Sequence, residues 1–458
     1  MLKRLEKAVK NACRVNPGER VLCAVSGGAD SVALLLLLKQ LADRGLFSLC
    51  AAHLDHCLRT QSGADAVFVA ELCLSLHVPL ISEAIDVQAL SAQRREGLEA
   101  AGRFARRRFL ERVAQEQGCT AIALAHHADD QAETVLFRLT RGSGLTGLVA
   151  MRHRSGPYIR PLLTFSKSEL NDWLVANGVV WREDATNLDL RFSRNRIRQQ
   201  VLPALRQINP QTVAALCRFS SQVALEEDFW REEVDAVLAK HLVVGEQGAT
   251  LSLSIETLLI LHPALRRRVI RGLLGRLPGD LQQFESGHID QIEALLLGSK
   301  PQAETCLPKV WVARRYDKLL ICAQPPEIMP FEFVVPKEGI YPLPNGERLV
   351  VVLASGSESA PHSSVVEFDA GQVSFPLVVR SVRAGDRFHP CGMVGHKRLK
   401  NYFIDNKIPF EIREKIPVVS AGKTILWLAG ERRCEGGWPV DGRPKLQMRL
   451  EPADFVDE

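Results

Sequence analysis

The stretch that decides the fold is Val21–Ser31, VLCAVSGGADS, in which a short apolar run leads directly into two glycines. Residues 21–25 predict a buried strand, and the helical pattern from Asp30 to Leu41 is apolar on almost every side. A glycine turn between a strand and a helix lets the backbone approach an anion, and the first amides of the helix then point at it. We therefore expect residues 26–31 to bind the phosphates of a nucleotide.

The residues of this loop have distinct expected roles. The hydroxyls of Ser26 and Ser31 can donate to phosphate oxygens, whereas the Asp30 carboxylate would repel a bare phosphate and is expected to hold Mg²⁺. A simpler interpretation is a helix cap after a glycine turn, which contributes ~1 kcal/mol and no binding. The loop matches neither the G-x4-G-K-[ST] nor the G-x-G-x-x-G fingerprint. The residues expected at the nucleotide are Ser26, Gly27, Gly28, Ala29, Asp30 and Ser31.

Strand and helix patterns alternate over the first ~200 residues, which predicts an α/β domain with a parallel sheet. Polar clusters follow three of the expected strands, at His53–Asp55, Glu83–Asp86 and His126–His127. Ligands of open α/β sheets bind beyond the carboxyl ends of the strands, so these clusters mark the expected site. Further expected strands cover 48–54, 79–85 and 121–125, and expected helices cover 64–76, 98–117 and 130–139.

The pattern changes near Gln207. Helical periodicity over 213–242, 263–277 and 287–297 predicts a small helical domain, and QPPEIMP at 324–330 indicates a linker. Short strand patterns with many glycines and prolines follow, so the remainder is expected to be a β-rich domain. The expected domains are residues 1–206, 207–324 and 325–458.

Composition excludes several classes of protein. The eleven cysteines contain no CxxC pair, which argues against a disulfide framework, a zinc ribbon or a cluster built on close cysteine pairs. A net charge of +5, from 58 basic and 53 acidic residues, is too mild to establish nucleic-acid binding. No apolar run is long enough to span a bilayer, and the N-terminal pattern is an amphipathic helix without a secretory core. We expect a cytoplasmic protein.

Four further motifs carry polar chemistry. HLDHCLR at 53–59 and AHHADDQAET at 125–134 follow strands, and GLEAAGRFAR at 97–106 lies on a long helix. On that long helix, Arg103, Arg106 and Arg107 share one face. In the motif at 125–134, Asp129 and Glu133 are four residues apart. The fourth motif is DATN at 184–187 followed by RNRIR at 194–198.

These motifs, with RGSG at 141–144 and RPLL at 160–163, resemble those of the tRNA(Ile)-lysidine synthetase family. SGGADS resembles the PP-loop of the ATP pyrophosphatase superfamily, which implies an adenine nucleotide alpha-hydrolase-like fold. The resemblance covers residues 20–205 and recurs in the C-terminal block that begins DRFHPCGMVGHKRLK. The chain departs from the family at Gly102, where alanine is usual, and at Arg107, where an aromatic residue is usual.

The resemblance implies an activity, its cofactors and its partners. ATP and Mg²⁺ would serve to adenylate O2 of the wobble cytidine in an isoleucine tRNA with a CAU anticodon. The ε-amine of free L-lysine would then displace AMP at C2. No membrane is expected, and a homodimer is one possible assembly.

Candidate roles follow for individual residues. Asp30 and Asp130 are the expected Mg²⁺ ligands, and Arg103 could pair with the α-carboxylate of lysine. A carboxylate must orient the lysine ammonium and accept its proton, and the sequence does not rank Asp129, Asp130 and Glu133 for this role. The candidate catalytic residues are therefore Asp30, Asp129, Asp130, Glu133 and Arg103; His53 and His127 are expected at ATP, and Arg106, Arg194, Arg196, Arg198, His389, Lys397 and Lys400 at tRNA or phosphate.

Alternatives stay open. The histidines at 53, 56, 126 and 127 could form a zinc site, and the arginines of 191–198 could lie on a solvated helix. A tRNA thiolase would usually need paired cysteines, and an ATP-dependent amide ligase would need an ammonia source. A catalytically dead tRNA-binding module would be expected to lack loop residues that this chain retains.

Overall fold

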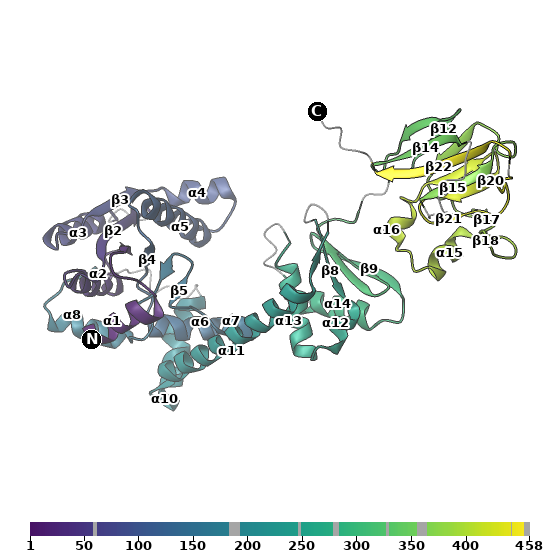
Figure 1. The fold of residues 1–458 in the computed structure, drawn as a ribbon. Coiled ribbons are helices and arrows are strands. Elements are labelled where there is room, and N and C mark those ends of the chain that lie inside the picture. Colours follow the sequence, from purple (N-terminus) through teal and green to yellow (C-terminus); the bar gives the residue numbers. More distant parts are fainter. Residues whose placement is uncertain are drawn as a thin grey trace. The chain divides into compact units, whose positions relative to one another are not determined.

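The computed structural model describes residues 1–57, 62–182, 193–245, 249–277, 284–326, 329–354, 364–440 and 442–452. The chain forms two compact units, Met1–Arg231 and Glu232–Glu458, which Figure 1 shows from purple to yellow along the sequence. The boundary falls inside a single long helix, α11 (Thr212–His241). The DATN motif at 184–187, Leu58 and Arg59 lie outside the described residues.

The first unit contains a six-stranded sheet in the order β3-β2-β1-β4-β6-β5. All its pairs are parallel except that between β5 and β6, so the parallel α/β fold expected from the sequence is confirmed. The chain moves outward from β1 to β2 and β3, then returns to the other side of β1 with β4, which creates a topological switch point. The strands are β1 (Arg20–Ala24), β2 (Ser48–Asp55), β3 (Leu80–Ala84), β4 (Ala121–Ala123), β5 (Arg154–Ser155) and β6 (Tyr158–Ile159).

Helices cover both faces of this sheet. On one face, α2 (Ala29–Ala42) is buried against α1 (Leu2–Lys7) and α8 (Lys167–Ala176), which explains why its sequence is apolar on nearly every side. The other face packs against α5 (Leu98–Glu116). The remaining helices of the unit are α3 (Ser62–Ser75), α4 (Val87–Arg94), α6 (Ala128–Thr140), α7 (Leu145–Leu148), α9 (Ser193–Arg196) and α10 (Leu202–Ile208), with π-helical turns at Ala8–Ala12 and Ile197–Val201.

The second unit begins with helices and a sheet that share one core. The expected helices are present as the end of α11, α13 (Pro263–Leu274) and α14 (Ser286–Leu297), with a short α12 (Ile255–Ile260). A five-stranded antiparallel sheet, which the sequence analysis did not identify, packs against them. Its strands in spatial order are β7 (Val243–Val244), β8 (Thr250–Ser254), β11 (Lys318–Cys322), β10 (Val310–Arg315) and β9 (Gln302–Leu307).

The arginines of α13 have a structural role. Arg266 is buried and donates to Glu293 of α14 at 3.1 Å, and Arg267 pairs with Asp290 and Glu293. These ion pairs join two helices of the second unit, so the positions of Arg266 and Arg267 are explained without RNA contact.

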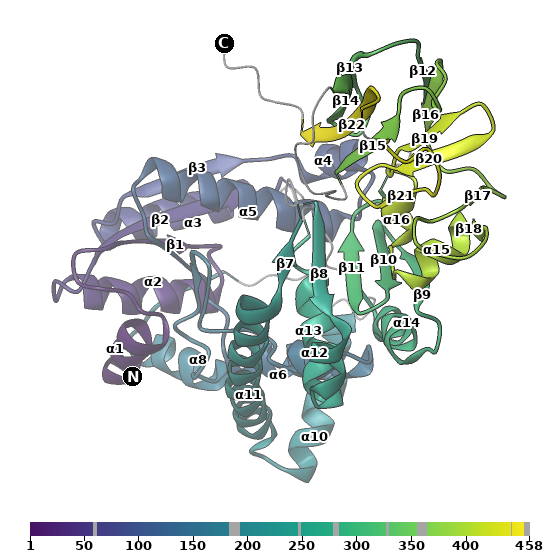
Figure 2. The ribbon, with the colours of Figure 1, turned by 45° about the vertical axis from the view of Figure 1, so that its right-hand side comes forward.

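The C-terminal part is β-rich, as expected (Figure 2). Two antiparallel sheets enclose a core around Trp427 and Phe368, and a two-stranded ribbon lies outside them. The first sheet contains β12 (Glu332–Val335), β16 (Leu377–Arg380), β19 (Val418–Ala421), β20 (Thr424–Leu428) and β21 (Arg432–Arg433); the second contains β13 (Gly339–Pro342), β14 (Glu347–Ala354), β22 (Lys445–Pro452) and β15 (Val365–Asp369); the ribbon is β17 (Arg387–Phe388) and β18 (Lys397–Arg398), and the helices are α15 (Leu399–Asp405) and α16 (Phe410–Arg413).

The eleven cysteines are free thiols, and only Cys57 and Cys306 among them are exposed. Burial raises the pKa of Cys13 and Cys73 to about 11. Within the described parts of the chain, no helix is long and apolar enough to cross a membrane.

Candidate active site

A cavity of about 760 Å³ opens at the carboxyl ends of β1, β2 and β4, where the strand order reverses. Its walls combine the glycine loop, three histidines and several carboxylates with an apolar patch from the strands and α5. The lining residues are Ala24, Val25, Ser26, Gly28, Asp30, Ser31, Ala52, His53, Leu54, Asp55, His56, Asp65, Glu99, Arg106, Leu110, Leu124, Ala125, His126, Asp130 and Arg182.

The glycine loop is held open toward this cavity by its own hydrogen bonds. Gly27 has φ of +88°, a conformation that a side chain would strain, and its carbonyl accepts from the amide of Arg182 at 3.0 Å. The Ser31 hydroxyl accepts from the Ser26 amide at 3.1 Å and donates to the Gly28 carbonyl at 2.9 Å. Because Gly28 caps α2, the free amides at the start of that helix are available to an anion.

Asp30 enters the site from the first turn of α2. Burial would raise the pKa of its carboxyl, but the hydrogen bond and charge of His127, with Lys167 and Arg198 nearby, outweigh burial and lower it. The carboxylate is therefore ionised. Its Oδ1 is buried and has no hydrogen-bond partner among the described residues, so an ionised oxygen is left for a cation.

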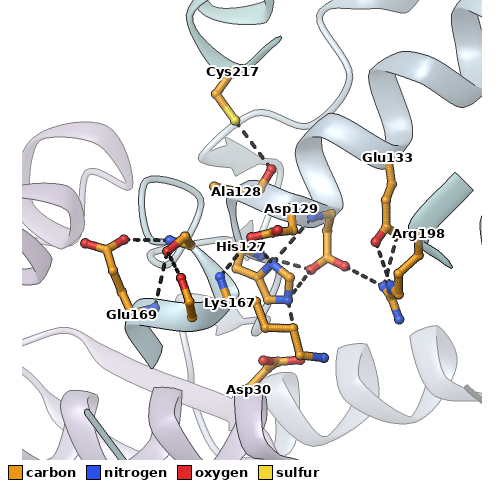
Figure 3. A network of polar contacts seen from close by, with 12 residues as sticks. Asp30, His127, Ala128, Asp129, Glu133, Lys167, Glu169, Arg198 and Cys217 are labelled. Carbon is orange, nitrogen blue, oxygen red and sulfur yellow. Dashed lines mark hydrogen bonds and ion pairs between the residues drawn. The ribbon is translucent and has the colours of Figure 1, made fainter. Parts of the chain in front are cut away.

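His127 joins the two helices that supply the carboxylates (Figure 3). Its amide donates to Asp130 Oδ2 at 3.0 Å, and its Nδ1 accepts from the Asp130 amide at 3.4 Å, so the ring caps α6. Its Nε2 lies 3.5 Å from Asp30 Oδ2 and 3.4 Å from Asp130 Oδ2. Burial alone would lower the pKa of His127, yet the contact with Asp30 and the charges of Asp130 and Asp129 raise it. The ring is only 1% exposed and does not line the cavity.

The three candidate proton acceptors differ in their surroundings. Asp130 lines the cavity and accepts from Arg198 at 3.2 Å. Glu133 is buried and is held by the same guanidinium at 2.6 and 3.0 Å; burial raises its pKa, although the Arg198 charge opposes this. Asp129 accepts from the Lys167 amide at 2.8 Å and pairs with Arg206, away from the lining residues.

Two of the three histidines of the cavity wall, His53 and His56, have defined roles in hydrogen bonding. His53 Nδ1 lies 2.9 Å from the Val25 carbonyl, which can only accept, so Nε2 is a bare acceptor. His56 Nε2 accepts from Arg106 at 3.1 Å, which places the ring proton on Nδ1. Burial and the Arg106 charge lower the pKa of His56 to about 4, and burial with the charges of Arg160 and Arg103 lowers that of His126 to about 4. Both rings are neutral at pH 7.

These histidines leave polar atoms without partners. His53 Nε2, His56 Nδ1 and His126 Nδ1 are buried and make no hydrogen bond to a described residue. Within the same described set, no group of three or more His, Cys, Asp or Glu side chains is arranged to hold a metal ion. The unpaired atoms are instead suited to a polar ligand that offers both donors and acceptors.

Arg103 and the arginines around it form a positive region beside the cavity. Burial lowers the pKa of Arg106 and of Arg160, and the charge of Arg103, which is exposed, lowers both further. Arg106 donates to His56, and Arg160 donates to the Arg152 carbonyl at 3.0 Å. None of the three has a carboxylate within salt-bridge distance among the residues described, so this region is suited to an anionic group.

Among the expected RNA-contacting residues of the first unit, Arg106 lines this cavity and Arg198 donates to Asp130 of its wall, whereas Arg194 and Arg196 are not lining residues. Arg196 is exposed, and Arg194 lies over the Phe137 ring at 5.9 Å. In the second unit, His389 donates to the Met393 carbonyl at 2.7 Å and Lys397 pairs with Asp405 at 2.5 Å. Lys400 is exposed.

Several residues that line the cavity or support its carboxylates were not identified from the sequence. The guanidinium of Arg206 and the backbone amide of Lys167 support Asp129. Arg182 and Asp65 line the cavity, with Arg182 Nε 3.8 Å from Asp65 Oδ1. Their partners lie far away in sequence, so no local pattern signals them. Glu99 was part of a quoted motif, but nothing in its spacing distinguished it from a solvated residue.

The chain is similar to known proteins over most of its length. Family models match for a PP-loop domain at residues 1–205, a TilS substrate binding domain at 253–320 and a TilS substrate C-terminal domain at 377–449. A tRNA(Ile)-lysidine synthase of Geobacter sulfurreducens is 40% identical over 426 residues, 92% of this chain and 90% of the relative. One from Dehalococcoides mccartyi is 35% identical over 98% of this chain and 99% of its own length.

Proposed function

Because this chain belongs to the tRNA(Ile)-lysidine synthase family, we propose that it joins free lysine to the wobble cytidine of an isoleucine tRNA with a CAU anticodon. ATP activates the base at O2, and the lysine amine replaces AMP at C2, so that lysidine, AMP and pyrophosphate are formed. The observation that carries this proposal is the pair of carboxylates, Asp30 and Asp130, that meet His127 Nε2 beside the glycine loop.

We propose that the triphosphate occupies the loop at 26–31, where helix amides and the Ser26 hydroxyl face the cavity. Asp30 and Asp130 fit Mg²⁺, because Mg²⁺ in nucleotide sites is commonly held by one or two carboxylates together with phosphate oxygens. The bare Oδ1 of Asp30 supports this assignment. When bound, Mg²⁺ would offset the charge that develops on the leaving pyrophosphate.

The amine needs a proton acceptor, since lysine with a pKa of ~10.4 is mostly protonated at pH 7. Asp130 is the favoured acceptor because it alone of the three candidates lines the cavity. Glu133 would position Asp130 indirectly, because Arg198 donates to both carboxylates. Asp129 would hold the start of α8 by accepting from the Lys167 amide. Arg103 would pair with the α-carboxylate of lysine, and His53 would bind ATP through Nε2.

The test is lysine incorporation. The protein is incubated with Mg-ATP, radiolabelled lysine and a CAU-anticodon isoleucine tRNA transcript, and acid-precipitable label is counted. We expect label that needs ATP and this tRNA, resists the mild alkali that cleaves aminoacyl esters, and disappears in Asp30→Asn. The matched control is Asp43→Asn, which makes the same chemical change at an exposed carboxylate paired with Lys39 near the other end of α2.

Other outcomes discriminate among the alternatives. Release of AMP and pyrophosphate that depends on tRNA, without incorporated lysine, would support base adenylation with another nucleophile. If folded protein gives neither label nor tRNA-dependent AMP, the proposal fails and the catalytically dead tRNA-binding module becomes the favoured alternative. Incorporation that survives in Asp130→Asn would remove that carboxylate as the proton acceptor and direct attention to Glu133.

We also propose a cytoplasmic location, where ATP, lysine and tRNA are available together. A homodimer remains a prediction, and sedimentation at micromolar concentration would test it.

A further inference from the structure

The wall of the cavity carries more carboxylates than cations, although its expected ligand is a triphosphate. Among the described residues that line it, the carboxylates are Asp30, Asp55, Asp65, Glu99 and Asp130, and the guanidinium groups are Arg106 and Arg182. One Mg²⁺ at Asp30 and Asp130 would offset the charge of those two carboxylates only. The phosphates of ATP therefore need a cation from the wall, because unscreened like charges in one site repel.

Arg182 is the lining cation that is bonded to the glycine loop. Its amide donates to the Gly27 carbonyl at 3.0 Å, and it forms an isolated parallel bridge with Gly28. A Cβ on Gly27 would lie 3.9 Å from Arg182 Cγ, so the side chain of Arg182 starts directly beside the loop. Arg106, in contrast, belongs to α5 and donates to His56 Nε2 at 3.1 Å.

The guanidinium of Arg182 lies on α3. Its Nε is 3.8 Å from Asp65 Oδ1, and its Cζ is 5.6 Å from the centre of the Phe68 ring. Asp65 and Phe68 are three residues apart in α3 and therefore share one face. The distance to Asp65 is longer than a hydrogen bond, and the two side chains are 51% and 33% exposed. Ion pairs of this kind are weak, so a better anion can replace Asp65.

We propose that Arg182 binds the β- and γ-phosphates of ATP, and that Asp65 holds its guanidinium beside the loop until the nucleotide enters. The inference deepens the proposed function and rests on ATP being the ligand of residues 26–31. A phosphate offers two oxygens to the planar fork of donors on a guanidinium, which is a stronger contact than the long pair with Asp65. ATP binding thus exchanges one ion pair for another.

The same contact would act on the leaving group. During activation of the base, O2 of the cytidine bonds to the α-phosphorus, and the bond from that phosphorus to the oxygen that bridges it to the β-phosphorus breaks. Pyrophosphate leaves with the electron pair, so negative charge grows on the group that Arg182 contacts. A preplaced cation at that position lowers the barrier. Asp65 can then take back the guanidinium as pyrophosphate departs.

The test is calorimetric titration of the full-length protein with Mg-ATP and, separately, with AMP. For Arg182→Gln we expect Mg-ATP to bind about tenfold more weakly, as for the loss of a hydrogen bond to a charged group, and AMP to bind as before. Arg182→Lys keeps the charge and should recover most of the lost affinity. The matched control is Arg231→Gln, which removes the same charge from an exposed arginine paired with Asp228 at 2.8 Å and should bind like the wild type.

Asp65→Asn has the opposite expected effect. It removes the carboxylate that competes with phosphate for Arg182, so Mg-ATP should bind more tightly than to the wild type. Its control is Asp43→Asn, at a carboxylate paired with Lys39, which should leave the affinity unchanged.

Two results would overturn the proposal. Mg-ATP affinity of Arg182→Gln equal to that of its control would remove the phosphate contact. If Arg182 instead only packs on the loop, Arg182→Lys would bind as weakly as Arg182→Gln, and Asp65→Asn would not tighten binding.

A second readout separates this inference from the proposed function. In the incorporation assay Arg182→Gln should raise KM for ATP and leave KM for lysine unchanged. If the wild type incorporates no lysine but the variants shift Mg-ATP binding as expected, the role of Arg182 stands and the proposed activity fails. If the wild type incorporates lysine and Arg182→Gln has an unchanged KM for ATP, the role of Arg182 fails alone.

Discussion

His127 shows how one residue couples the nucleotide loop to the second carboxylate. Its ring caps α6 and contacts Asp30 at the start of α2, and those carboxylates raise its pKa. A group whose pKa is raised on folding stabilises the fold fully below its unfolded pKa, and this contribution disappears as the pH rises through the folded value. The unfolded reference for histidine is 6.5.

At pH 6 the imidazolium faces Asp30, Asp130 and Asp129, although its protonated Nδ1 can then no longer accept from the Asp130 amide. Because the raised pKa indicates that the carboxylates dominate, we expect His127→Asn to lose more unfolding free energy at pH 6 than at pH 8.5 in the absence of ligands. Asparagine can still cap the helix, so the difference reports the ring charge. Urea unfolding at both pH values measures it, with the exposed His77→Asn as control. The lowered pKa of Asp30 keeps that carboxylate ionised across this window and does not contribute to the slope. An equal loss at both pH values would show that the ring is neutral in the fold.

Site residues that belong to short sequence motifs could be identified from the sequence. The loop at 26–31 follows β1 closely, and Asp130 lies in the first turn of the helix that comes after β4, so motif and position were enough to identify them. The support of Asp129 by Arg206, and of Glu133 by Arg198, joins positions more than 60 residues apart in sequence. Only the fold brings such pairs together.

At the scale of elements, α13 and α11 approach closely at Gly272. A Cβ on Gly272 would lie 2.8 Å from Val234 Cγ1 and 3.4 Å from Leu238 Cδ1. Valine is stiff at χ1, so the neighbour cannot turn away cheaply. At Gly287 in α14, a Cβ would meet nothing within 4 Å among the described atoms.

The same substitution should therefore have opposite effects in these two helices. Gly287→Ala is expected to raise the free energy of unfolding by ~0.5 kcal/mol, through helix propensity. Gly272→Ala has the same gain in helix propensity, but the added methyl group overpacks the contact between α13 and α11 at a cost of ~1–3 kcal/mol. The variant should therefore have a lower free energy of unfolding than the wild type. Chemical denaturation of both variants decides the point. A stabilised Gly272→Ala would mean that the helices part easily.

The long elements were predictable because their periodicity runs over many residues. The helix expected at 213–242 is observed as Thr212–His241. The strands of the middle sheet were missed because each is short and lies beside helical patterns. TLSLS at Thr250–Ser254 alternates as a strand should, but five residues gave too little signal against the flanking helices.

At the scale of the whole molecule, the chain divides into two compact units. Chains of this kind commonly unfold in more than one cooperative transition. The cavity belongs to the first unit, so Mg-ATP should stabilise the transition of that unit by ~2.7 kcal/mol at a hundredfold excess over Kd.

Scanning calorimetry with and without Mg-ATP tests this expectation. The second transition should stay in place, and Asp30→Ala should abolish the shift of the first. If both transitions move together, the units are energetically one body. The parallel sheet and the β-rich region were predictable at this scale, whereas the division inside α11 was not, because a continuous helical pattern carries no sign of a boundary.

The two exposed thiols give the chain a natural place for a chemical probe. Thiolates react with maleimides, so buried cysteines with raised pKa values react slowly at neutral pH, and Cys57 and Cys306 should label first. Cys57 follows His56, whose ring lines the cavity. In a Cys306→Ser background, a dye attached to Cys57 would sit at the mouth of the nucleotide cavity, and its emission would follow ATP entry in real time without any radioactive substrate.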